Sequence, residues 1–258
     1  MPRKPRSFRV NAIVLKHHDY GEADRILTIY TRERGKLRAL AKGVRKVHSR
    51  KGGHLEPFTH VSLQLAEGRN WSIVSQAEAQ HTYDDLKKDL ETIGYASYTV
   101  ELVERFTLEE EENAPIFNLL KNTLTRLNRG DPAQLVTRYY EIRLLDLLGF
   151  RPELKTCVVT GEEIRPENQY FSAALGGVVS PGGGKDLSGA VPISVRALKY
   201  LRHFQRSSYR EAIRAIISPE VQQELEVLMQ YYLTYLLERG LNTPSFLRRV
   251  RRESKGED

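Results

Sequence analysis

The apolar residues of this 258-residue chain change their spacing near residue 80, and this change most restricts the folds open to it. Up to that point, short apolar runs alternate with turn residues at roughly ten-residue intervals, a pattern typical of a small β-barrel. The five runs are Val10–Leu15, Ala23–Tyr30, Leu37–Ala41, Val61–Leu65 and Trp71–Val74. From about Glu78 the apolar residues recur every three or four positions, which is the helical period. The pattern predicts an α+β protein, with a five-stranded barrel followed by helices.

The helical part is interrupted by a segment, residues 152–190, that is rich in glycine and proline and follows neither period. We expect helices on both sides of it, at Ala114–Leu127, Ala133–Leu148, Ser194–Arg206, Tyr209–Ile216 and Pro219–Glu238. The acidic run Glu109–Glu112 is predicted to be an exposed loop. The expected organisation is a barrel (1–79), a first helical part (80–151), an insertion (152–190), a second helical part (191–247) and a charged flexible tail (248–258).

Positive charge is concentrated at one end of the chain. Residues 1–54 hold fifteen lysines and arginines against four carboxylates, a net charge of +11, whereas the whole chain carries +7. The remaining residues therefore sum to −4. Such asymmetry indicates a module that binds a polyanion.

The densest cationic stretch, Arg34–Lys51, follows the turn at Gly35. Lys36 and Arg38 should share one strand face, because side chains alternate along a strand. The glycines of the stretch would let it follow a phosphate backbone, a contact that carries no sequence information. The candidate DNA-binding residues are Arg25, Arg34, Lys36, Arg38, Lys42, Arg45, Lys46, Arg50 and Lys51.

Aromatic residues that could stack on bases lie in the same region, because single-strand binders combine a basic groove with aromatic side chains. Tyr20 is one of them. Tyr30, Phe58 and Trp71 lie in or beside apolar strands, so we assign these three to the core.

Signatures of catalysis are missing, and the chain is not expected to be an enzyme. It has neither a phosphate-binding loop of the Walker kind nor a dinucleotide fingerprint. Asp19, Glu22 and Asp24 could hold a divalent metal, as in a nuclease, but they more simply moderate a basic surface. No cofactor is expected.

The single cysteine, Cys157, excludes an internal disulfide and fits a reducing compartment. No apolar run is long enough for a membrane span, and the N-terminus lacks the apolar stretch of a signal peptide. We therefore expect a cytoplasmic, nucleoid-associated protein without a membrane partner.

Several stretches together resemble the RecO family of recombination mediators. In the N-terminal part these are Ala12–Leu15, Tyr20–Leu27, Gly35–Leu37 and Ala41–Arg45. In the helical part they are Tyr95–Tyr98, Arg138–Glu141 and Leu144–Pro152. The resemblance covers nearly the whole chain and implies that the barrel is an oligonucleotide-binding (OB) fold.

The insertion departs from the family pattern. Many relatives carry two Cys-x-x-Cys pairs there, which hold zinc. Here the corresponding positions are Cys157, Thr160, Ser180 and Gly183. Glycine has no ligating side chain and neutral hydroxyls are poor zinc ligands. We therefore expect a zinc-ribbon-like insertion that has lost its ligands and binds no metal.

The resemblance also implies an activity. Similar proteins bind single- and double-stranded DNA without sequence specificity, anneal complementary strands and act with RecR to load RecA in recombinational repair. The acidic, apolar-ended C-terminal tail of single-strand binding protein docks on their helical domain. Arg138 and Arg143 are possible rims of such a site.

Three alternatives remain open at this point. A basic barrel could serve structured RNA instead of DNA. A nuclease would cleave strands with magnesium at Asp19, Glu22 and Asp24. A scaffold would work mainly through its helical part and would tolerate deletion of residues 1–79.

Overall fold

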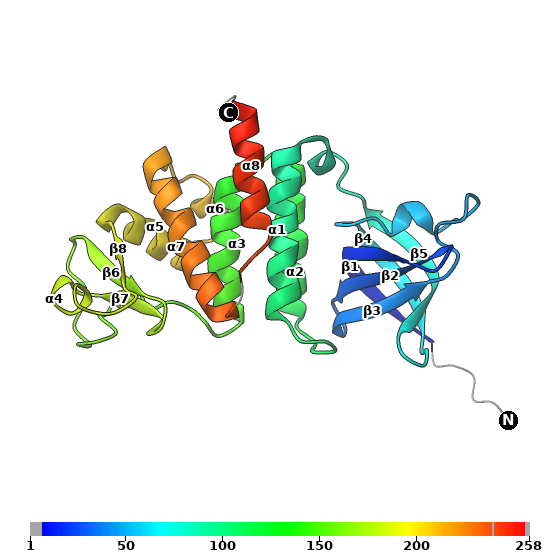
Figure 1. Ribbon diagram of the computed structural model, residues 1–258, viewed down its shortest axis with the longest axis horizontal. Coiled ribbons are helices and arrows are strands. Elements are labelled where there is room, and N and C mark those ends of the chain that lie inside the picture. The colour runs from blue at the N-terminus through cyan, green and yellow to red at the C-terminus, as the bar shows by residue number, and fades with distance from the viewer. Residues whose placement is uncertain (1–6, 239, 256–258) are drawn as a thin grey trace. The chain divides into compact units, whose positions relative to one another are not determined.

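The computed structural model describes residues 7–238 and 240–255, which form two compact units. The first unit extends to Gly130 and holds the barrel with two helices, and the second begins at Asp131 (Figure 1). The division does not fall after residue 79, because the helices that follow the barrel contact its strands β1 and β2.

Five strands close the barrel in the order β1-β2-β3-β5-β4 (Figure 1). Their bounds are β1 Ser7–Tyr20, β2 Asp24–Thr31, β3 Gly35–Ala41, β4 His60–Ala66 and β5 Ser72–His81. Neighbouring strands are antiparallel except β3 and β5, which are parallel. This is the five-stranded OB arrangement, and helices follow it, so these two parts of the predicted fold class are confirmed.

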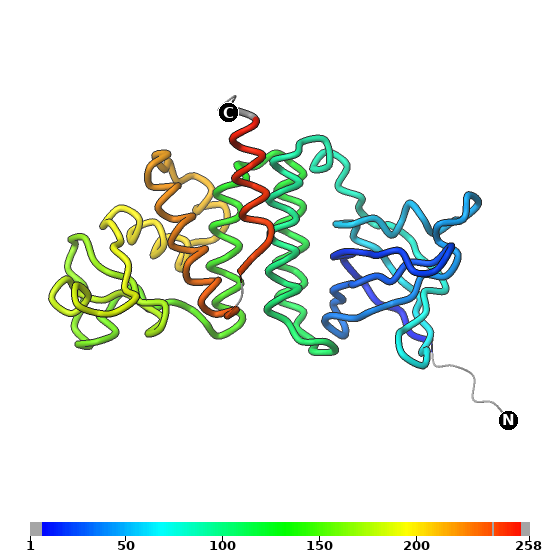
Figure 2. Tube along the Cα trace, in the orientation of Figure 1, coloured from blue at the N-terminus to red at the C-terminus, as the bar shows by residue number. Residues whose placement is uncertain are grey.

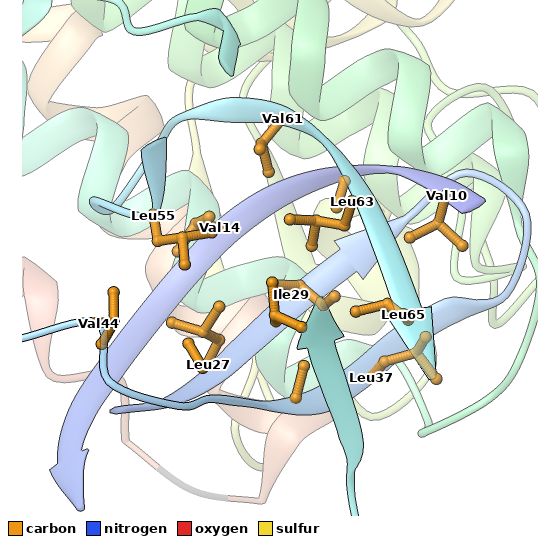
Figure 3. Packing of buried hydrophobic residues seen from close by; sticks show 14 residues of the cluster. Val10, Val14, Leu27, Ile29, Leu37, Val44, Leu55, Val61, Leu63 and Leu65 are labelled. Carbon is orange, nitrogen blue, oxygen red and sulfur yellow. The ribbon is translucent and has the colours of Figure 1, made fainter. Parts of the chain in front are cut away.

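The barrel interior is filled by aliphatic side chains from all five strands (Figure 3). Along β1 the inward residues are Val10, Ala12 and Val14. A bulge between Val14 and Lys16 then shifts the register, so that the even-numbered residues beyond it point outward. The bulge therefore decides which side chains the last part of β1 presents to a ligand.

The turn from β2 to β3 depends on Gly35, whose φ of +62° is in the left-handed region. A Cβ added there would lie 1.8 Å from the carbonyl oxygen of Glu111. The acidic run passes over this turn with exposed side chains, and the backbone N–H of Glu110 donates to Lys36 O at 2.9 Å. Its backbone thus adds to the edge of β3.

The helical period starts later than expected from the sequence. Strand β5 continues to His81 because its residues pair with β4. After the short 3-10 helix η2 (Leu86–Lys88), α1 spans Leu90–Phe106 and α2 spans Ala114–Asn128. The Asp89 side chain caps α1 by accepting from Thr92 N at 2.7 Å.

The second unit packs helices α3 (Ala133–Leu147), α5 (Val195–Arg206), α6 (Tyr209–Ala212) and α7 (Pro219–Leu237) together. The insertion is a small sheet, not a loop. Its strands are β6 (Gln169–Ser172), β7 (Gly177–Val179) and β8 (Val191–Ile193), in the order β7-β6-β8, with the short helix α4 (Pro181–Gly184) beside them. Phe171 anchors the sheet by packing edge-on against Tyr232 of α7, with ring centroids 5.2 Å apart.

The prediction of a flexible tail from residue 248 was wrong for 248–255, which belong to helix α8 (Thr243–Lys255). Leu247 and Val250 lie three residues apart, on one helix face, and both are buried. Burial of this apolar stripe stabilises the helix despite its many charges. Residues 256–258 lie outside the described residues. Among the helices that the structure describes, none has the length and apolarity to span a bilayer.

Candidate nucleic-acid interface

A basic loop, residues 42–51, connects β3 to the 3-10 helix η1 (Gly52–His54), which leads to β4 by an irregular path (Figure 2). The barrel holds it at several points. Val44 is buried in the barrel core, and Gly43 N donates to the carboxylate of Asp24 at 2.7 Å. Arg45 N donates to Ala23 O at 2.9 Å. The loop is therefore anchored at its base.

Three cations of the basic loop point into solvent. Lys42, Lys46 and Arg50 are exposed, and none of them forms an ion pair within the part of the chain that the structure describes. Val47 between them is 95% exposed. These three side chains keep their full positive charge for contacts with a phosphate backbone.

Three other residues predicted to bind DNA, Arg25, Arg45 and Lys51, form contacts within the barrel and its basic loop. Arg25 donates to the carboxylates of Glu56 at 2.9 Å and Asp19 at 3.3 Å, and the hydrogen bond to Glu56 raises the pKa of Arg25. Arg45 pairs with Asp19 at 3.3 Å. Lys51 Nζ donates to the backbone carbonyls of Lys42 and Val74. These three cations are partly neutralised or oriented inward.

The ammonium of Lys36, a predicted DNA-binding residue, is engaged within the protein. Its Nζ donates to Glu104 O at 2.6 Å and also to Thr107 O, at the C-terminal end of α1. Burial lowers the pKa of Lys36. The ammonium satisfies helix carbonyls that have no partner within the helix. Strand alternation correctly puts Lys36 and Arg38 on one face, but the helix covers only the first.

Arg34 and Arg38 are exposed on the barrel, each with a neighbour. The Arg34 guanidinium carbon lies 3.8 Å from the centroid of the Phe8 ring, a cation–π contact. Arg38 pairs with Glu109 at 2.8 Å, with both side chains about half exposed. Both arginines can reach a ligand, and Arg38 would have to exchange Glu109 for a phosphate.

On the outer face of β1, β2 and β3, sequence reasoning identified Arg38 but missed its neighbours on β1 and β2. Two cross-strand rows form this face, Lys16–Thr28–Arg38 and His18–Ile26–Leu40. Trp71 lies at its edge and lines two hollows of about 190 and 660 Å³, both also lined by Arg38. The assignment of Trp71 to the core was therefore wrong, whereas Tyr30 and Phe58 are buried as predicted. The bulge in β1 was not recognised from the sequence, and it decides that Lys16 and His18 point to this outer face.

Two of the three acidic residues considered for a metal site, Asp19 and Asp24, have other partners. Asp19 pairs with two arginines, and Asp24 accepts from the basic loop. Over residues 7–238 and 240–255, no three His, Cys, Asp or Glu side chains converge in a way that could hold a metal ion.

The four positions that the sequence matches to zinc-binding cysteine pairs all lie in the insertion, but their side chains do not fit the metal. Cys157 Sγ accepts from Ser180 N at 3.3 Å and lies 3.5 Å from Ser180 Oγ. Burial would raise the pKa of the thiol, but hydrogen bonds from Ser180 and Thr160 outweigh it and lower this pKa to about 6. One sulfur, two hydroxyls and a glycine make a poor zinc site.

A third hollow, of about 880 Å³, lies in the second unit between α5 and the chain leading into α7. Its lining combines apolar residues with cationic ones: Ile216, Ile217, Pro219 and Val221, and Arg196, Lys199, His203 and Arg206. Arg138 cannot rim a peptide site, because it is buried and paired with Glu141 at 2.8 Å. Arg143 donates to Gln205 O and also lies outside this hollow.

Two family models match this chain, and they meet just after the barrel, not at the division between the two units. The family model "Recombination protein O N terminal" matches residues 6–83, and "Recombination protein O C terminal" matches residues 87–244. A protein of Roseiflexus sp. (strain RS-1) named DNA repair protein RecO is 41% identical, covering 96% of this chain and 87% of the relative. Proteins of the same name from Pelotomaculum thermopropionicum and Dehalococcoides mccartyi are 37% and 35% identical, covering 94% and 92% of this chain and 94% and 93% of their own lengths. An OB barrel matched by the N-terminal model, followed by helices matched by the C-terminal model, makes this chain a member of the recombination protein O family.

Proposed function

We propose that this protein is a non-catalytic mediator of DNA repair and recombination that binds single- and double-stranded DNA without sequence specificity. The observation that carries the proposal is a set of three exposed cations on the basic loop. Lys42, Lys46 and Arg50 have no acidic partner among the described residues. Family membership supports the repair role. It works in the cytoplasm, on nucleoid DNA.

Strand annealing follows from this charge without covalent chemistry. Two DNA strands repel each other through their phosphates, and cations that neutralise both allow them to approach. Base pairing then supplies the sequence specificity, which phosphate contacts lack. The protein acts with RecR and thereby assists the loading of RecA.

The test is a salt series of DNA binding by the triple variant Lys42→Glu, Lys46→Glu, Arg50→Glu. Loss of three phosphate contacts should weaken binding by roughly 10- to 100-fold and flatten the log–log salt slope by about two on single strands and nearly three on duplexes. The matched control, Lys155→Glu, Arg165→Glu, Lys185→Glu, changes the same net charge at exposed sites of the insertion.

An equal loss of affinity in the two triple variants would show that net charge alone matters and would reject the basic loop as the site. Preference for RNA over single-stranded DNA of matched length and base composition would favour the alternative, an RNA-binding OB protein. Annealing of complementary strands precoated with single-strand binding protein tests the mediator role itself.

The hollow in the second unit suits the tail of single-strand binding protein. An acidic peptide with an apolar end needs apolar side chains and cations in one hollow, and here Arg196, Lys199 and Arg206 line the hollow together with apolar residues. Binding of a fluorescent tail peptide should fall about tenfold in Arg196→Glu or Lys199→Glu. The control Lys185→Glu should leave the peptide affinity unchanged. An unchanged peptide affinity in Arg196→Glu and Lys199→Glu as well would place the docking site elsewhere.

A further inference from the structure

The aromatic pair Tyr20 and Trp71 forms an exposed step on the barrel. The Tyr20 ring is at the end of β1 and 48% exposed, and the Trp71 ring comes from the β4–β5 connection. Their centroids are 5.7 Å apart and the ring planes are nearly perpendicular, at 87°. The two rings are in contact with each other, and neither belongs to the buried core of the barrel.

This step is contiguous with the basic loop. Arg45 of that loop donates to Gly21 O, directly after Tyr20, and pairs with Asp19, directly before it. On its other side, Trp71 lines the 190 Å³ hollow with His18, Ile26 and Thr28. A strand whose phosphates lie on the basic loop would thus bring its bases to the aromatic step.

The outer face of β1–β3 and the basic loop differ in their free positive charge. On the outer face of β1–β3, Lys16 pairs with Glu104 and Arg38 pairs with Glu109, so this face offers few free cations. A near-neutral surface with aromatic rings suits bases, whereas the basic loop suits phosphates. OB folds bind oligonucleotides on this strand 2–3 face, beside the β1–β2 and β4–β5 connections.

We infer that Tyr20 and Trp71 stack on unpaired bases and give the protein a single-strand-specific contact beyond its charge-based DNA binding. The inference rests on the proposed DNA-binding function. Duplex DNA can use only the basic loop, because its bases are already stacked and paired. Single-stranded DNA uses both regions.

The test exploits the fact that Trp71 is the sole tryptophan of the chain. Base stacking on its indole should quench the intrinsic fluorescence of the unmodified protein when single-stranded oligonucleotide is added. A duplex of the same sequence and an abasic phosphodiester strand should leave the emission nearly unchanged at concentrations where anisotropy of the labelled DNA shows binding.

Substitutions give an independent readout. Trp71→Ala and Tyr20→Ala should each weaken single-strand binding roughly tenfold with duplex affinity preserved. Trp71→Phe should retain most of the single-strand affinity, because phenylalanine keeps an aromatic ring. Tyr235→Ala is the matched control, since Tyr235 is 49% exposed in the second unit. Circular dichroism and thermal unfolding verify that each variant is folded.

Anisotropy that rises without any change in Trp71 emission would overturn the stacking inference while leaving DNA binding intact. Equal quenching by duplex and single strand would also overturn it. Absence of an anisotropy change with every DNA would instead refute the proposed function itself, and the stacking site with it.

Discussion

The Lys36 ammonium nitrogen lies 2.6 Å from the carbonyl oxygen of Glu104, in the last turn of helix α1. This contact joins strand β3 to the helix that packs on the barrel. It converts a lysine from the most basic stretch of the chain into a cap for a helix C-terminus. The same contact shows that not every cation of a basic stretch in the sequence is available to a ligand.

Lys36→Met should lower the free energy of unfolding by about 1–2 kcal/mol, because carbonyls at the end of α1 lose a charged donor. The affinity for DNA should stay within about twofold of the unsubstituted protein, since the ammonium already donates to the carbonyls of Glu104 and Thr107. Urea unfolding and DNA anisotropy measure the two effects. A large loss of DNA affinity with unchanged stability would contradict the capping role.

Gly35→Ala should destabilise the barrel more than Gly21→Ala. Both glycines have positive φ, which costs an alanine about 1–2 kcal/mol. A Cβ at Gly35 would also collide with Glu111 O, whereas a Cβ at Gly21 meets nothing within 4 Å. Thermal unfolding of the two variants compares backbone strain with and without the collision. Equal losses would mean that the acidic run moves away freely.

His60 should make the protein acid-sensitive. Burial, followed by the charges of His81 and Lys121, lowers its pKa to about 4, and neither ring nitrogen has a hydrogen-bond partner among the described residues. Between pH 6.5 and 4 the unfolded chain binds a proton that the folded chain does not. Stability from this group is therefore complete above pH 6.5 and declines as the pH falls toward 4.

The measurement is Tm from about pH 7 to about pH 5 for His60→Leu. This variant should lose several degrees less than the unsubstituted protein over that range. His48→Leu, at an exposed site of the basic loop, serves as the control and should not alter the slope. Parallel pH profiles for all three proteins would show that other groups govern acid unfolding.

The zinc-ribbon-like insertion should bind no zinc in the unsubstituted protein. It should bind zinc after the triple substitution Thr160→Cys, Ser180→Cys, Gly183→Cys. The Cys157 Sγ and Ser180 Oγ are 3.5 Å apart, close to the separation of about 3.8 Å between two thiolates on one tetrahedral zinc. A Cβ at Gly183 would make its nearest contact at 3.4 Å, so a cysteine fits there. Elemental analysis should give about one zinc per triple-substituted chain.

Elemental analysis of the unsubstituted protein is the complementary measurement. About one tightly held zinc per chain would mean that ligands other than these four positions exist. Absence of zinc from the triple variant, if it is folded, would show that the four positions do not converge as the structure describes.

The sequence by itself determined the barrel, the helices that follow and the location of the charge. Strand alternation, turn glycines and helical periodicity are local properties, so residues close in sequence suffice to specify them. Gly35 illustrates this, because the need for a positive φ is visible from the turn alone.

Only the tertiary structure decided which cations remain available and where bases could lie. Lys36 and Arg38 are equivalent in the strand pattern, and the distant end of α1 separates them. Tyr20 and Trp71 meet because a bulge turns the end of β1 outward and because β5 pairs with β3. Such contacts depend on how segments far apart in the chain pack, which no local periodicity specifies.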